Sequence, residues 1–435
     1  VKLADWANIR TVFSYDDTRV RDHIYYSKDH FNAKSDNGTV SEMFTNYSTI
    51  VSSTTANLNH TFGEKHNVTF LAGFEAEKNN TDFMRSTGTN LPVSSLQVVQ
   101  TAGTTEANAY YWGNSIVSIL SRAEYNYDNK YYFSASYRRD GSSKLGPDSR
   151  WGNFWSVAGS WRINDEEFMK DIDWISNLRL RASYGVNGTL PSSNNGWRSL
   201  ASYSYQYGGE PGGALANAAD ANLSWETSYT SNFALEFGFL DDRIKGSIEY
   251  FNRDSKDLLQ DVPISYITGF SSTLKNVGEI NNKGIEFELS GDIITNKDFR
   301  WSASINGSHV KSEVTKLYGG QDIIWNDPTG GDSRATYIYR EGESTLALYG
   351  REWAGVDKAT GKNIWYSNNE NEDMTLNGRK VVYDKNDADQ IVLADVHPAL
   401  FGGFNTDFEW KGLTLGLNFT YKLGGKLQDG AERDV

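Results

Sequence analysis

Residues 131–161 read YYFSASYRRDGSSKLGPDSRWGNFWSVAGSW, and this stretch decides the fold. Apolar and polar side chains alternate over residues 131–138 and again over 155–163, which is the period of a β-strand. A turn rich in Gly, Ser, Asp and Pro separates the two runs. The alternation returns at residues 178–184, so three consecutive strands each have one apolar face and one polar face that carries arginines.

Two architectures shield such an apolar face from water. In a soluble sandwich the face packs against a second sheet, and the arginines contact solvent. In a membrane β-barrel the face contacts lipid, and the charged side chains line the lumen. Aromatic residues also gather at the strand ends, which is typical of the interface between lipid and water and favours the barrel. These residues are Tyr125, Tyr127, Tyr131, Tyr132, Trp151, Phe154, Trp155 and Trp161.

The composition restricts the other possibilities. The 435 residues include 25 Tyr, 21 Phe, 13 Trp and no Cys, so a disulfide framework and a thiolate metal site are both excluded. The mean hydropathy is -0.58. No run reaches the roughly 18 to 20 apolar residues of a spanning helix, so any membrane crossing must use strands. The net charge of -14 argues against a nucleic-acid partner.

Short and long connections alternate between the expected strands. We expect about 13 barrel strands, with all the short turns at one end of the sheet. Outer-membrane barrels have short turns in the periplasm and long loops outside the cell. The sequence therefore predicts an all-β fold, an antiparallel transmembrane β-barrel. The expected short turns are 63–65, 128–130, 241–243, 296–297 and 411–412, and the expected long loops are 16–47, 78–113, 185–225, 254–281 and 311–399.

The stretch from Tyr131 to Gly188 resembles the barrel of the SusC/RagA-like TonB-dependent outer-membrane transporters. Three further motifs resemble the same family in the same order: NVGEINNKGIEFE at residues 276–288, YGREWAGVDKATG at 349–361 and HPALFGGF at 397–404. The resemblance implies a barrel of about 22 strands, an N-terminal plug inside it and a segment that contacts TonB. It also implies import of oligosaccharides or peptides across the bacterial outer membrane, together with a SusD-like surface lipoprotein.

The sequence departs from this family plan in several respects. About 13 strands is an odd number, whereas a bacterial barrel closes on an even number. No plug, TonB box or secretion leader precedes Val1, and polar sequence follows Tyr421 in place of an aromatic terminal strand. We therefore expect residues 1–435 to form one partial barrel domain of a longer transporter, unable to transport alone.

Charged residues at polar positions of the strands are candidates for the lumen wall. The resemblance implies contact with a plug or a passing solute, whereas simple hydration of a polar wall explains the same pattern equally well. The candidates are Arg122, Glu124, Arg179, Arg181, Glu236, Lys245, Glu249, Glu286 and Glu288.

Aromatic residues in the expected long loops are candidates for ligand or partner contacts. Tyr and Trp rings stack on sugars and anchor protein interfaces, but they could equally pack the loops against each other. The candidates are Tyr110, Tyr111, Trp112, Trp197, Tyr203, Tyr205 and Tyr207.

Neither catalysis nor a cofactor is expected. Carboxylate pairs such as Glu286 and Glu288 fit a wet wall better than a glycoside-cleaving acid and base, so no catalytic residue is assigned. Residues 355–362, GVDKATGK, lack the phosphate-loop spacing and are predicted to form a hairpin turn. Oxygen ligands between Asn368 and Asp389 could bind calcium, although a solvated acidic loop is the simpler interpretation.

Two other functions stay open at this point. A passive porin-type channel has the same polar wall without an energy-coupled plug. A soluble β-sandwich could bind carbohydrate or act as an adhesin, and it would dissolve without detergent. The sequence does not identify the cargo.

Overall fold

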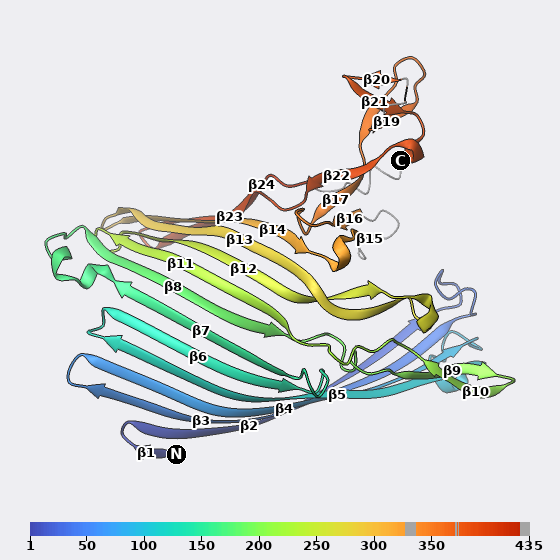
Figure 1. The fold of residues 1–435 in the computed structure, drawn as a ribbon, viewed down its shortest axis with the longest axis horizontal. Coiled ribbons are helices and arrows are strands. Elements are labelled where there is room, and N and C mark those ends of the chain that lie inside the picture. Colours follow the sequence, from blue (N-terminus) through green and yellow to red (C-terminus); the bar gives the residue numbers. More distant parts are fainter. Residues whose placement is uncertain (327–335, 370–371, 373, 427–435) are drawn as a thin grey trace.

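A computed structural model shows one 14-stranded antiparallel sheet in which the strand order follows the chain (Figure 1). The structure describes residues 1–326, 336–369, 372 and 374–426. The sheet is curved and open, with β1 and β2 at one edge and β24 at the other. Because unpaired edges cannot face lipid, closure of this wall into a barrel requires further strands. The expected partial, all-β barrel is confirmed.

The strands of the 14-stranded sheet, which form the barrel wall, differ in length. Apart from the three-residue β1, the thirteen strands correspond to the expected barrel strands. They are β1 (Lys2–Ala4), β2 (Ala7–Tyr26), β3 (Thr39–Phe62), β4 (His66–Thr89), β5 (Thr104–Tyr127), β6 (Tyr131–Ser142), β7 (Trp151–Arg162), β8 (Ile175–Thr189), β11 (Glu226–Phe239), β12 (Ile244–Pro263), β13 (Ser272–Thr295), β14 (Phe299–Lys316), β23 (Leu400–Trp410) and β24 (Leu413–Leu423).

Among the described residues, three smaller sheets lie within the long loops. They are β9 (Ala201–Tyr207) with β10 (Glu210–Leu215); β15 (Ile323–Asn326), β16 (Thr336–Tyr339), β17 (Ala347–Arg351) and β22 (Gln390–Asp395); and β18 (Trp353–Val356), β19 (Asn363–Ser367), β20 (Thr375–Leu376) and β21 (Arg379–Val382). The 3-10 helices in the described part of the chain are η1 (Val99–Thr101), η2 (Ile163–Asp165), η3 (Glu167–Met169), η4 (Tyr266–Thr268), η5 (Tyr318–Gly320) and η7 (Lys385–Asp387). Within the described residues no helix has the length and apolar character needed to cross a membrane.

The large sheet forms a single layer, and its apolar face is exposed. Phe233 on β11 lies opposite Ala182 on β8 and Tyr250 on β12, and 57% of Phe233 remains accessible. Phe133 and Ile248 are similarly exposed. No second layer of the described residues packs on this face, so the sandwich alternative is wrong. Lipid is the environment that fits an apolar face of this kind.

The outward apolar positions have the length of a membrane crossing. On β5 they run from Tyr127 to Val117, which matches the roughly 9 to 11 residues that a tilted strand needs. Aromatic rings stack at the short-turn end of this band: Tyr127 contacts Tyr131, and Tyr131 contacts Trp161. The predicted interfacial aromatics Tyr127, Tyr131 and Trp161 are therefore in place at this end. The prediction is wrong for Tyr132, which lies beside Arg179 on the polar face, and for Phe154, which is buried.

Three of the five predicted long loops are wrong, because the strands on either side of them extend further than expected. Strands β3, β4 and β5 each have 24 residues, far more than a bilayer requires. The connections are only residues 27–38, 90–103 and 264–271, in place of the expected 16–47, 78–113 and 254–281. Beyond the membrane both faces of a sheet contact water, so the alternation that predicts a strand disappears there.

The short turns and the longest loop agree with the sequence pattern. Turns at 63–65, 128–130, 240–243, 296–298 and 411–412 all lie at the same end of the sheet. Residues 317–399 form the long excursion between β14 and β23, and it contains both four-stranded sheets. Its predicted hairpin is confirmed, because Val356 pairs with Asn363 and Gly361 takes the left-handed φ of 71° that the turn needs.

Candidate functional site

Charged side chains from β5, β8, β11, β12 and β13 lie on the face opposite the apolar one. We call this set the polar wall, and it comprises Arg122, Glu124, Arg179, Arg181, Glu236, Glu249, Glu286 and Glu288. Strand register brings them together: Arg179 lies opposite Glu236, and Glu249 lies opposite Glu286. The ninth candidate, Lys245, lies opposite Gly238 and is exposed near the short-turn end.

Ion pairs link the polar wall across β8, β11 and β12. Arg181 Nε lies 2.6 Å from Glu236 Oε1, and Arg181 Nη2 lies 3.7 Å from Glu249 Oε2. Arg179 also approaches Glu236, at 3.8 Å. On β5, Arg122 pairs with Glu124. Glu236 thus contacts two arginines, and Arg181 contacts two glutamates, so these four side chains form one charged network.

Two hollows lie along this wall. A cavity of about 640 Å³ is bordered by Arg122, Glu124, Arg179, Arg181 and Glu249 together with Ser, Asn and Thr side chains. A second hollow of about 290 Å³ is bordered by Glu249, Glu286 and Glu288, and Glu286 accepts a hydrogen bond from Ser308 at 3.2 Å. The wall therefore changes from arginine-rich at β8 to glutamate-rich at β13. This arrangement supplies hydrogen bonds and charge to a polar solute.

The long loop at residues 190–225 is fixed at its base and free at its tip. Trp197 packs against a buried cluster of Leu145, Phe154, Leu223 and Trp225. The cluster is held by hydrogen bonds from Ser149 Oγ to the Leu223 carbonyl (2.6 Å) and from Trp225 Nε1 to the Arg150 carbonyl (3.0 Å). Trp197 therefore has a packing role.

The tip of this loop is the β9–β10 hairpin. It carries Tyr203, Tyr205 and Tyr207 at alternate positions of β9, which places them on one face. Tyr203 is 77% and Tyr207 is 89% accessible. The hairpin projects from the long-loop end of the sheet (Figure 1). These three loop tyrosines are therefore available for contact.

The remaining aromatic candidates are not in a loop. Tyr110, Tyr111 and Trp112 lie in β5, where Trp112 pairs with Thr81 and Tyr111 with Asp82 on β4. The prediction of loop residues is wrong because this part of the strand lies beyond the apolar band. Tyr110 stacks on Phe83, with ring centroids 4.7 Å apart, while Tyr111 points to the outward face and is 86% accessible.

Comparison with known proteins settles the family. A family model described as "TonB dependent receptor-like, beta-barrel" matches residues 3–428. The chain belongs to the TonB-dependent receptor family. TonB-dependent receptor P3 of Formosa agariphila is 32% identical over 394 residues, which are 85% of this chain and 38% of that protein. TonB-dependent receptor SusC of Bacteroides thetaiotaomicron is 34% identical over 257 residues, covering 56% of this chain and 26% of that protein.

A solved structure refines this assignment. The structure of the RagAB peptide transporter superimposes with a TM-score of 0.85 at 28% identity, covering 97% of this chain and 46% of that one. The receptor chain is thus a SusC/RagA-like TonB-dependent transporter barrel of the outer membrane, and it spans less than half the length of these relatives. The outer membrane transporter YddB of Escherichia coli shares the fold, with a TM-score of 0.52 at 13% identity.

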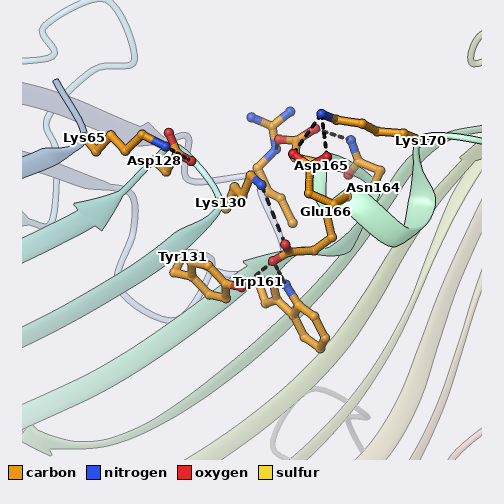
Figure 2. A network of polar contacts seen from close by, with 11 residues as sticks. Lys65, Asp128, Lys130, Tyr131, Trp161, Asn164, Asp165, Glu166 and Lys170 are labelled. Carbon is orange, nitrogen blue, oxygen red and sulfur yellow. Dashed lines mark hydrogen bonds and ion pairs between the residues drawn. The ribbon is translucent and has the colours of Figure 1, made fainter.

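A polar network braces the short-turn end of the receptor chain. Figure 2 shows Tyr131 from β6 and Trp161 from β7 both pointing at Glu166, which follows η2. Trp161 Nε1 donates to Glu166 Oε1 at 3.0 Å, and Lys130 Nζ lies 3.6 Å from Glu166 Oε2. The hydrogen bond from Tyr131, followed by that from Trp161, holds the pKa of Glu166 below its ordinary value. Two strands and their turn are thereby tied to one carboxylate.

Sequence reasoning missed a second charged group on the polar face of the receptor chain. Arg138 on β6 donates from Nε to Asp140 at 2.7 Å and from Nη2 to Glu75 at 3.1 Å and to Ser118 at 2.8 Å. Its position in the alternation indicated the correct face. Its partners could not be predicted from the sequence. Strand register places Glu75 of β4 directly opposite Ser118 of β5, so both lie within reach of Arg138.

The acidic loop of the receptor chain is only partly described. Glu370, Asn371 and Asp373 lie outside the described residues. Of the others, Asp384 caps η7 by accepting from the Asn386 amide, and Asp389 accepts from the Asn368 amide. Across the described residues no three His, Asp or Glu side chains gather as metal ligands. Calcium binding in this loop stays a prediction.

Proposed function

We propose that this chain forms the barrel wall of an importer of oligosaccharides or peptides, energised through TonB and working with a SusD-like surface lipoprotein. The observation that carries the proposal is the polar wall, placed behind an apolar band of membrane-crossing length. The 640 Å³ cavity gives a hydrated solute both arginine donors and glutamate acceptors. The proposed mechanism involves binding and passage of the solute and no covalent step, since the relatives are named as receptors and transporters.

Support for the choice of cargo comes from two places. The relative with the RagAB fold is named a peptide transporter. A wall that is arginine-rich at β8 and glutamate-rich at β13 suits the two ends of a zwitterionic peptide. The exposed tyrosines of β9 suit the flat face of a sugar ring equally well. Peptides and oligosaccharides therefore both remain within the proposal, and uptake measurements must include both.

Energy coupling separates the proposal from a passive channel. We expect cells that carry the full-length protein to take up labelled peptides or oligosaccharides only when TonB is present and the inner membrane is energised. An uncoupler or deletion of TonB then abolishes uptake. Uptake that persists at the same rate after both treatments contradicts the proposal and identifies a porin-type channel. Deletion of the proposed SusD-like lipoprotein tests the partner, because we expect uptake at low solute concentration to fall without it.

A further inference from the structure

A groove opens on the outward face of the sheet, immediately beyond the apolar band. Its volume is about 440 Å³, and Ser48 of β3, Lys78, Asn80 and Asp82 of β4, and Tyr111 of β5 contribute to its lining. None of these residues belongs to the polar wall. The groove lies on the long-loop side, which is the outer side of an outer-membrane barrel.

The alternation of side chains along β4 and β5 shows that the groove lies on the outward face of the sheet, directly beyond the apolar band. On β4 the outward series Phe70, Phe74, Lys78 and Asp82 passes from apolar to polar. On β5 the residue beside Phe74 is Ile119, and the residue beside Lys78 is Ser115. Lys78 pairs directly with Ser115, so its ammonium group lies at the level where hydrocarbon ends. Long cationic side chains take this position beside lipid headgroups.

The lining has the chemistry of a saccharide site. Asp82, Asn80 and Ser48 offer carboxylate, amide and hydroxyl groups to sugar hydroxyls, and Asn80 is held near Ser48 by a 3.5 Å hydrogen bond. The Tyr111 ring is 86% accessible and gives a stacking surface. Gly113 also lines the groove, and the site requires a glycine there. A Cβ at this position would lie 3.0 Å from Asn80 Oδ1 and nearer still to a backbone carbonyl.

We propose that this groove binds the saccharide headgroup of a glycolipid from the outer leaflet. The acyl chains then lie on the apolar band below, against Phe74 and Ile119, which are 52% and 54% accessible. Lys78 contacts an anionic group on the headgroup, and Tyr111 stacks on a sugar ring. Continuity between groove and band selects a lipid over a free sugar, since only an amphiphile fills both. The proposal is independent of the imported cargo.

The test uses the full-length receptor extracted from its own outer membrane in mild detergent. Native mass spectrometry counts the lipids that each receptor retains. We expect the wild type to keep one glycolipid and the double variant Lys78→Ala with Tyr111→Ala to retain about tenfold less, since a charge contact and a ring contact each contribute a factor of several. Lys283→Ala is the matched control: Lys283 is exposed on the same face of β13, next to Ile285 at the edge of the apolar band, but outside the groove.

Each outcome decides the proposal. Loss of glycolipid in the double variant but not in Lys283→Ala supports it, and Tyr111→Phe should retain the lipid because the ring stays. Equal retention in all variants, or retention of phospholipid alone, overturns it. So does equal affinity for the purified glycolipid and its deacylated headgroup, because that result describes a free-sugar site. If the double variant does not fold, as judged by heat-dependent gel mobility, the single variant Lys78→Gln replaces it.

Discussion

Arg181 on β8 and Glu236 on β11 form the closest cross-strand ion pair of the polar wall, with Nε and Oε1 2.6 Å apart. Arg181 also reaches Glu249 on β12, while Glu236 also attracts Arg179. Two arginines and two glutamates on three strands therefore form one chain of charges. Because both members of the central pair are partly exposed, at 43% and 27%, the pair holds charge in position more than it stabilises the fold.

Glu236→Gln should change selectivity with little effect on stability. The substitution removes the carboxylate that Arg179 and Arg181 share, and Arg181 keeps its contact with Glu249. We expect less than about 1 kcal/mol loss of unfolding free energy, in line with exposed pairs. Uptake of anionic peptides should rise relative to cationic ones, as measured by competition between labelled peptides in cells with the full-length protein. Asp241→Asn, in a short turn, is the control; an unchanged ratio in Glu236→Gln contradicts a role for the polar wall in solute contact.

The alternation that located the polar wall fails a short distance away, and the reason is physical. Arg181 and Glu236 alternate with Leu180 and Leu235 because one face meets lipid and the other meets water. At Tyr110 to Trp112 water lies on both sides, so no period marks the strand and the sequence was interpreted as a loop. The cluster around Phe154 was also missed, since its partners Leu145 and Leu223 come from loops that only the fold brings together.

Glu166 should be the most sensitive residue at the short-turn end. In Glu166→Ala the Tyr131 hydroxyl and Trp161 Nε1 lose their shared acceptor, and Lys130 loses its counterion. We expect a lower midpoint of heat-induced unfolding, followed by gel mobility. Glu166→Gln keeps an acceptor oxygen and should lie between Glu166→Ala and the wild type. The neighbouring Glu167 forms an ion pair with Lys170 in which both side chains are exposed, so Glu167→Ala should leave the midpoint unchanged. Equal midpoints for both alanine variants contradict this account.

Gly188→Ala should destabilise the buried cluster by overpacking. A Cβ at Gly188 on β8 would clash with the Phe154 ring and lie 2.9 Å from Trp225, whose ring meets Phe154 edge to face at a centroid distance of 5.1 Å. Overpacking of this kind costs about 1–3 kcal/mol. Denaturant unfolding measures the loss. Gly159→Ala on β7 is the control, because the nearest atom to its Cβ would be 3.9 Å away. If both variants lose the same unfolding free energy, contact with the Phe154 ring is not the reason for a glycine at position 188.

Acid should loosen the β18–β19 hairpin through Asp357. Its carboxylate accepts hydrogen bonds from Thr360 Oγ1 (2.6 Å), Tyr383 Oη (2.8 Å) and the Ala359 amide (3.1 Å). These bonds, with Thr360 first, lower the pKa of Asp357 from 3.8 to about 2. Because the folded pKa is depressed, the stabilisation is fully present above about pH 4 and is lost as the pH falls through 2.

Pepsin, which is active across this range, provides the measurement. We expect cleavage within residues 353–382 to accelerate between pH 4 and pH 2, after division by the rate for a denatured control at each pH. Asp357→Asn cannot ionise, so its cleavage should already be faster at pH 4 and should change less on acidification. Lys358→Ala, in the same turn but outside the hydrogen bonds of Asp357, should follow the wild type. A wild-type pH profile in Asp357→Asn would show that another acid controls the hairpin, because no other group in the variant has lost its charge.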